Sequence, residues 1–149
     1  MRDRPIAAAA ASELRRRWKK LLKRGAHFVD FDPVRRHRMR IQAKTLRYAA
    51  EFFAGVFPGR KAERRRKVFV ARLGGLLDAL GNLNDIAVHE AFSKRLVDEE
   101  AIGEQCRDVC VRAFAAGRLS GREEARFASA LKEAERALRS FSKAKPFWS

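Results

Sequence analysis

The sequence predicts an all-α protein that folds as an antiparallel up-and-down bundle of about six helices. Strong helix formers (Ala, Leu, Arg, Lys and Glu) dominate the 149 residues, whereas the 9 Gly and 4 Pro cluster at a few breaks. No segment alternates apolar and polar residues with the period of two that is typical of a half-buried strand. Helices are expected at residues 6–24, 34–57, 60–80, 84–100, 104–117 and 120–142.

The first two of these helices have recognisable ends. Gly25 follows the first helix and is expected to adopt the left-handed conformation that commonly ends helices. Pro33 comes directly after Asp32, an arrangement typical of the first turn of a helix. Pro58-Gly59 is expected to end the second helix, because neither residue favours a helix interior.

Glycines and capping residues also mark the later helices. Gly81 is expected to end the third helix, and Asn84 or Asp85 is expected to cap the fourth. Gly121 stands near the start of the last helix. Connections this short favour antiparallel neighbours, which is the basis for the up-and-down arrangement.

Three of the helices carry apolar residues that step by three or four positions, which is the spacing of one helix face. Such stripes are typical of a bundle core rather than of a cofactor site. They consist of Met39, Ala43, Leu46, Ala50, Phe53 and Phe57 on the second helix, of Phe69, Leu73, Leu76, Leu77 and Leu80 on the third, and of Phe127, Leu131, Ala134, Leu138 and Phe141 on the last.

The charge of the chain is strongly positive and unevenly distributed. Lys and Arg number 34 against 18 Asp and Glu, a net charge of +16. Residues 1–72 hold 22 basic and 6 acidic residues, whereas residues 73–149 hold 12 of each. A segregated positive surface indicates a partner with dense negative charge, and nucleic acid, anionic lipid and inorganic polyphosphate all fit this description.

Other features exclude several classes of protein. No run approaches the roughly 18–20 apolar residues of a membrane span, and the apolar run at residues 6–11 is too short for a secretory signal peptide. Two cysteines exclude a disulfide-built scaffold, so a cytoplasmic location is expected. Cys106 and Cys110 are expected to be core thiols, and no metal or cofactor is expected.

The helix expected at residues 34–57 carries a second face made largely of cations. At about 100° per residue, six side chains fall within about 100° of arc, roughly 130° from the core stripe. They are His37, Arg40, Lys44, Arg47, Tyr48 and Glu51. Cations about 5–6 Å apart suit a ligand that is itself a string of negative charges, because Arg offers a planar fork to phosphate oxygens and Lys a mobile point charge. On composition alone, a solvated basic helix face is an equal alternative.

Neighbouring helices are expected to add cations to this face. Lys61, Arg65 and Arg72 share one side of the third helix, close to the edge of its core stripe. Arg15, Lys19 and Lys23 line the first helix. Taken singly, each of these six is expected to be a solvated surface residue.

The sequence resembles CHAD domains, the conserved histidine alpha-helical domains. His37-Arg38-Met39-Arg40, followed by Lys44, Arg47-Tyr48 and Glu51, resembles the family's signature. Leu80-Gly81-Asn82-Leu83-Asn84-Asp85 is similar to a second signature, and Pro146-Phe147-Trp148 is similar to the family's C-terminal tail. The resemblance covers about residues 14–148, nearly the whole chain.

The resemblance implies a fold of two helical bundles related by a pseudo-twofold axis, each with one copy of the signature. This chain has one copy together with the tail, so it resembles the second half of such a domain. A half domain implies a partner, either a second copy of the same chain in a homodimer or a separate N-terminal half. Family members also accompany triphosphatase domains of the CYTH type, which implies a partner of that kind.

The function implied by the resemblance is non-catalytic binding of inorganic polyphosphate, in the cytoplasm or in polyphosphate granules. By motif position, the ligand contacts would be His37, Arg40, Lys44 and Arg47, with Lys61, Arg65 and Arg72 added from the next helix. Tyr48 and Glu51 would orient these side chains, and Asn84 and Asp85 would be structural, as a cap and as a partner for a basic side chain.

Two other functions compete with this interpretation. A nucleic-acid-binding helical module fits the charge, but no recognition-helix pattern is present and aromatic residues do not interleave with the cations. A catalytic subunit that hydrolyses phosphate chains would need inward-facing carboxylates for a metal, and the acidic residues show no such pattern. We therefore expect a binding protein and no enzyme.

Overall fold

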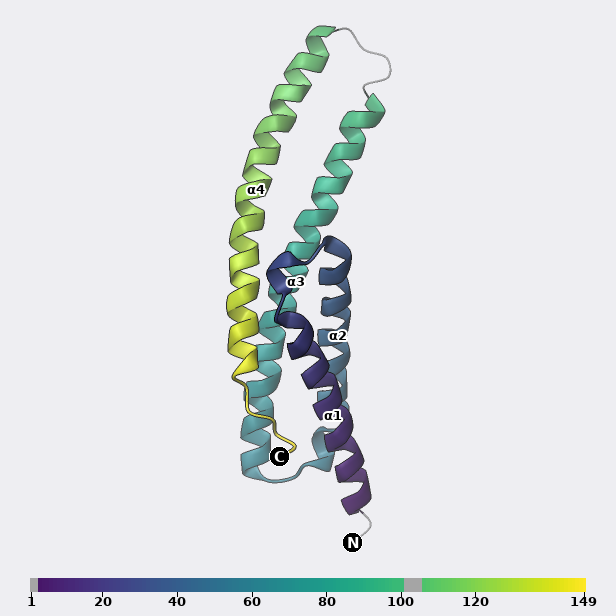
Figure 1. Cartoon of the computed structure of the whole chain (residues 1–149), viewed down its shortest axis with the longest axis vertical. Coiled ribbons are helices and arrows are strands. Elements are labelled where there is room, and N and C mark those ends of the chain that lie inside the picture. Colours follow the sequence, from purple (N-terminus) through teal and green to yellow (C-terminus); the bar gives the residue numbers. More distant parts are fainter. Residues whose placement is uncertain (1–2, 101–105) are drawn as a thin grey trace.

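The structure, a computed structural model, describes residues 3–100 and 106–149. These residues form four α-helices: α1 (Asp3–Gly25), α2 (Pro33–Phe52), α3 (Arg60–Glu100) and α4 (Cys106–Ser142). Two short 3-10 helices, η1 (Phe28–Asp30) and η2 (Ala54–Val56), lie in the first two connections. The helices run alternately up and down, and α1 and α2 cover only the lower part of the long α3–α4 pair (Figure 1). The all-α class is confirmed, and the described residues contain no strand.

The prediction of six helices is wrong. The helices expected at 60–80 and 84–100 are one continuous helix, α3, and those expected at 104–117 and 120–142 merge into α4. Gly81 costs about 1 kcal/mol relative to Ala inside a helix. Leu80 and Leu83, on either side of it, are 1% and 0% exposed, so the packing of a continuous apolar stripe outweighs that cost. Asn84 and Asp85 therefore lie inside α3 and cap nothing.

The start and end of α2 follow from local chemistry. Asp32 is the N-cap, and its Oδ1 accepts a hydrogen bond from the Arg35 backbone N–H at 2.7 Å. Pro33 occupies the first turn of the helix, as predicted. The helix ends at Phe52, five residues earlier than predicted, and η2 follows. Gly59 then adopts a φ of +111°, which only glycine adopts readily, and α3 begins at the next residue.

Gly25 has a role that the sequence did not suggest. Among the described residues only Gly59 has a positive φ, so Gly25 is not a left-handed helix end. It is buried, and a Cβ at this position would lie 2.8 Å from Cδ2 of Leu138 and 3.3 Å from Cε of Met39. A side chain here would collide with these atoms, so the glycine permits a close approach between the end of α1 and α4.

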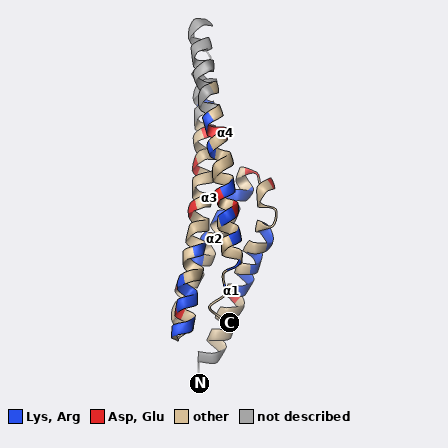
Figure 2. Cartoon of the chain, turned by 90° about the vertical axis from the view of Figure 1, so that its left-hand side faces the viewer, with Lys and Arg blue, Asp and Glu red and all other residues tan. Residues whose placement is uncertain are grey.

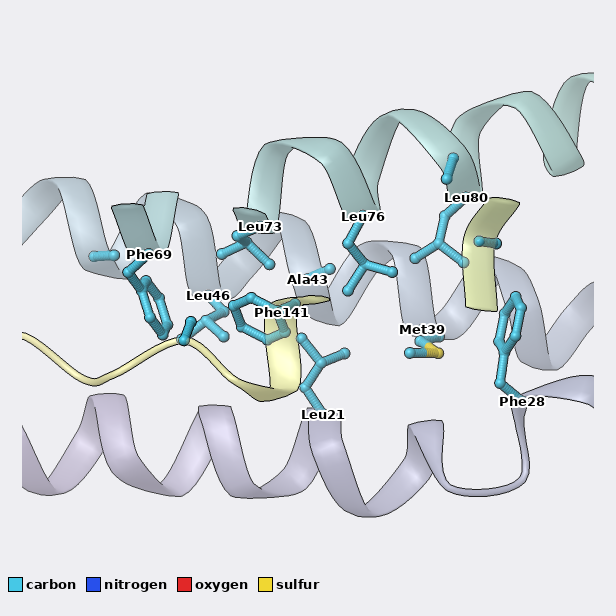
Figure 3. Close-up of a cluster of buried hydrophobic side chains, with 14 of the residues drawn as sticks. Leu21, Phe28, Met39, Ala43, Leu46, Phe69, Leu73, Leu76, Leu80 and Phe141 are labelled. Carbon is cyan, nitrogen blue, oxygen red and sulfur yellow. The ribbon is translucent and has the colours of Figure 1, made fainter. Parts of the chain in front are cut away.

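The predicted apolar stripes form the core (Figure 3). The stripe on α2 is buried at Met39, Ala43, Leu46 and Ala50, and the stripe on α3 at Phe69, Leu73, Leu76 and Leu80. Helix α4 contributes Ala134 and Phe141, and α1 adds Leu14 and Leu21. The remaining stripe residues, among them Phe53, Leu77 and Phe127, are half-buried and pack against this cluster.

The segment after α4 completes the core. Phe147 and Trp148 are 3% and 6% exposed although they lie outside any helix. The Trp148 ring packs edge-on against Phe69 and Trp18, with centroids 5.1 and 6.2 Å apart, and the Phe147 ring does so against Phe57 at 5.6 Å. This aromatic cluster closes the bundle between α1, α3 and the connection after α2.

The upper part of the α3–α4 pair projects beyond α1 and α2 (Figure 1). Val88 and Phe92, on this part of α3, are 61% and 60% exposed. Among the described residues, no helix has the length and apolar character needed to cross a bilayer.

Candidate anion-binding site

The cations predicted on α2 lie on an exposed face of that helix. His37 and Lys44 are exposed, and Arg40 and Arg47 are half-buried. These four residues are called the cationic column below. Lys and Arg outnumber Asp and Glu over the lower half of the molecule, where α1, α2 and the beginning of α3 lie (Figure 2).

Helix α3 runs beside the column and approaches it at Gly81 and Asn84. A Cβ on Gly81 would lie 3.8 Å from Nε of Arg40, and one turn further along α3, Asn84 contacts His37. The backbone of α3 therefore comes close to Arg40, with no side chain at position 81 between them.

His37 is oriented by Asn84. The imidazole Nδ1 lies 3.3 Å from Oδ1 of the Asn84 amide. Because an amide oxygen only accepts hydrogen bonds, Nδ1 carries the proton and donates it. The free Nε2 of the neutral ring is then an acceptor, and it becomes a donor when the ring is protonated. Asn84 thus orients the histidine, rather than capping a helix.

Two further α2 residues contact members of the column. Nε of Arg47 donates to Oε1 of Glu51 at 3.0 Å, in an ion pair in which both side chains are more than 40% exposed. Nζ of Lys44 lies 5.9 Å from the centroid of the Tyr48 ring, within the range of a cation–π contact. Both contacts fit the orienting role expected for Glu51 and Tyr48, and Glu51 offsets one of the positive charges.

The structure does not bring Arg65 and Arg72 to the column. Arg72 donates from Nη1 to the backbone oxygen of Ser140 on α4 at 3.2 Å, and Arg65 donates to that of Ser149 at 3.1 Å. Arg72 and Gly81 are nine residues apart, which places them about 180° from each other around α3. Lys61, exposed in the first turn of α3, lies one turn from Arg65 on the same side. These three residues belong to a different surface, and their binding role stays a prediction.

No metal site accompanies the cations in the described part of the chain. No group of three or more His, Cys, Asp or Glu side chains in those residues could hold a metal ion. Asp85 is exposed and has no basic side chain within 4.0 Å among the described residues, and the ion pair expected for it stays a prediction. The side chains of Cys106 and Cys110 lie outside the described ones.

Gly81 and Asn84 were predicted at helix ends, so their position beside the column was not predicted. One available signal was the apolar spacing, which continues without interruption from Leu76 through Leu80 and Leu83. A stripe that keeps its helical period across a glycine indicates one helix and not two. With α3 continuous, Gly81 and Asn84 fall on a single side of it, the side that faces α2.

A known protein family matches more than half of the chain. A family model described as CHAD domain matches residues 2–94, which include the whole of α2, the cationic column, Gly81 and Asn84. The match ends before α4 and the C-terminal aromatic residues, although the sequence resemblance extends to about residue 148. The search of curated proteins found no match, and neither did the search of solved structures.

Proposed function

The chain belongs to the CHAD domain family, and from this premise we propose that it binds inorganic polyphosphate along the cationic column of α2 without hydrolysing it. CHAD domains are in general non-catalytic helical domains associated with polyphosphate. The observation that carries the proposal is that four cationic side chains, two exposed and two half-buried, share one face of α2 beside a helix that approaches Arg40 with a glycine. They are His37, Arg40, Lys44 and Arg47.

The spacing of the column fits a linear polyanion. His37 and Arg47 are ten residues apart, about 15 Å along the helix axis. Over that length one carboxylate, that of Glu51, pairs with a member of the column among the described residues. A chain of phosphates laid along the column would replace the counterions of these cations, and Arg and Lys would donate charge-assisted hydrogen bonds to its oxygens.

A second candidate function, binding of single-stranded nucleic acid, is favoured by one observation. Tyr48 and Phe52, one helical turn apart on α2, are 56% and 82% exposed, and exposed rings next to cations can stack on bases. Competition between polyphosphate and single-stranded DNA for the chain at fixed salt separates the two functions. Displacement of polyphosphate by single-stranded DNA at equal phosphate concentration would favour nucleic-acid binding as the function. A phosphate-release assay tests separately whether the chain hydrolyses polyphosphate.

Binding is expected to weaken with salt. Four contacts from the column predict a linear fall of log K against log salt, with a slope of roughly −2 to −4 if the value for nucleic acids transfers to polyphosphate. Removal of one column charge by Lys44→Ala should flatten the slope by a little under one unit, about the value of one contact. Arg38→Ala removes the same charge from the same helix, outside the column, and should leave the slope unchanged. A slope near zero in the unmodified chain would contradict the proposal.

His37 is expected to contact the bound chain through Nε2, which in the protonated ring donates to a phosphate oxygen while Nδ1 stays bonded to Asn84. His37→Gln should therefore weaken polyphosphate binding in calorimetric titrations. His89→Gln is the control, because His89 contacts Glu123 on α4. An equal loss in both variants would mean that His37 does not touch the ligand.

The partners implied by the family remain part of this proposal. A CYTH-type triphosphatase would supply the catalysis that a binding domain lacks. A second copy of the chain, or a separate N-terminal half, would supply the second signature. Sedimentation equilibrium with and without polyphosphate distinguishes a self-associating half domain from one that binds alone.

A further inference from the structure

A second group of cations surrounds a hollow on the opposite side of α3 from the column. An open hollow of about 300 Å³ lies between α3 and the C-terminal end of α4. It is lined by Arg72, Arg136, Arg139, Ser140 and Lys143. Its volume is at the lower end of the range of about 300–1,000 Å³ that is usual for small-molecule sites, so it suits a compact ion.

The cations from α4 are spaced as those of the column are. Lys132, Arg136, Arg139 and Lys143 step by four, three and four residues, which places them within about 60° of arc. The even charge count of residues 73–149 conceals this line, because that half also holds 12 acidic residues, two of which (Glu133 and Glu135) lie in the same part of α4. Spacing along the helix, and not net charge, is the sequence signal for it.

The cations around the hollow form no ion pairs in the part of the chain that the structure describes. Within the described residues, none of the four lining cations has a carboxylate within 4.0 Å. Basic residues at a helix C-terminus are favoured by the helix dipole, which alone would account for Arg139 and Lys143. It does not account for Arg72, which comes from α3 and is held at the hollow by its hydrogen bond to the Ser140 oxygen.

We propose that this hollow is a second anion site, which takes a compact oligophosphate of two or three phosphates. The guanidinium groups of Arg72, Arg136 and Arg139 offer planar forks for phosphate oxygens, and Lys143 adds a point charge. The ligand is either a free oligophosphate or the end of a long polyphosphate chain. The proposal does not depend on the column, since the hollow is about 180° away around α3.

The test is calorimetric titration of the full chain with tripolyphosphate. Arg136→Ala combined with Arg139→Ala is expected to lower the affinity about tenfold or more, because hydrogen bonds between charged groups are the strong ones. Both side chains are exposed, so the fold should survive, which circular dichroism will check. The matched control is Arg122→Ala with Arg126→Ala, which removes the same charge from exposed positions of α4 outside the hollow and should change little.

The double variant Arg40→Ala with Lys44→Ala separates this proposal from that of the column. It should leave tripolyphosphate affinity nearly unchanged and weaken the binding of long-chain polyphosphate. Weaker binding of long chains in the Arg136 and Arg139 variant as well would identify the end of a chain as the ligand. Equal losses of tripolyphosphate affinity in the hollow and control variants, or a loss confined to the column variant, would overturn the proposal.

Discussion

Replacing Arg40, Lys44 and Arg47 together by alanine is expected to lower the affinity for long-chain polyphosphate by about two orders of magnitude, or about 2.8 kcal/mol. Each of the three removes a charge-assisted contact along the column, and none of the three is buried in the core. Arg40→Ala should have the largest single effect, because Arg40 lies beside Gly81 and has no ion pair among the described residues. Calorimetric titration measures the affinity, and circular dichroism should show unchanged helicity.

The matched control removes three exposed cations from α1, by Arg15→Ala, Lys19→Ala and Lys23→Ala. It lowers the net charge equally and should cost far less affinity. A comparable loss in both triple variants would mean that total charge, and not the column, binds the ligand. Glu51→Gln provides a test of opposite sign: it releases Arg47 from its ion pair and should strengthen binding.

Trp148→Ala is expected to lower the free energy of unfolding by about 3–5 kcal/mol, the usual cost of removing a buried aromatic ring. The ring is 6% exposed and contacts Trp18, Phe69 and Phe147. Its Nε1–H is buried with no hydrogen-bond partner, so Trp148→Phe keeps an apolar ring, removes an unpaired donor and should cost much less. Urea unfolding followed by circular dichroism measures both variants.

Phe52→Ala is the control for this experiment, because that ring is 82% exposed and its removal should change stability by less than about 0.5 kcal/mol. If Trp148→Ala were equally mild, the C-terminal segment would not be part of the folded core. The expected result extends the stable unit well beyond residue 94, where the match to the family ends.

The helical class and the core could be predicted because both depend on local spacing. The residues expected on the α2 stripe, from Met39 to Ala50, are fully buried. The number of helices could not be predicted in the same way, since Gly81 weakens a helix locally while the packing of Leu80 and Leu83 preserves it. Gly25 is a second example. It lies close to Leu138, more than a hundred residues further along the chain, and local spacing could not predict that contact.

The cations that share one face of α2 could be predicted from the sequence, whereas the contacts of the candidate site with α3 could not. The arc of His37, Arg40, Lys44 and Arg47 follows from the angle per residue. Two of these four side chains are exposed and two are half-buried in the structure. Which side of α3 faces α2 depends on tertiary packing. For that reason Arg72 was assigned to the column although it contacts α4, and the contact between Asn84 and His37 was missed.

The continuity of α3 has a mechanical consequence. Two helices joined at Gly81 would have a hinge there, and the projecting part of the molecule could swing relative to the bundle. A single helix has no joint at Gly81, because its backbone hydrogen bonds continue through that residue. Asn84, which contacts His37, and Glu100, the last residue of α3, lie about 24 Å apart along one helix axis. The projecting part of α3 is therefore connected to the column by one continuous helix.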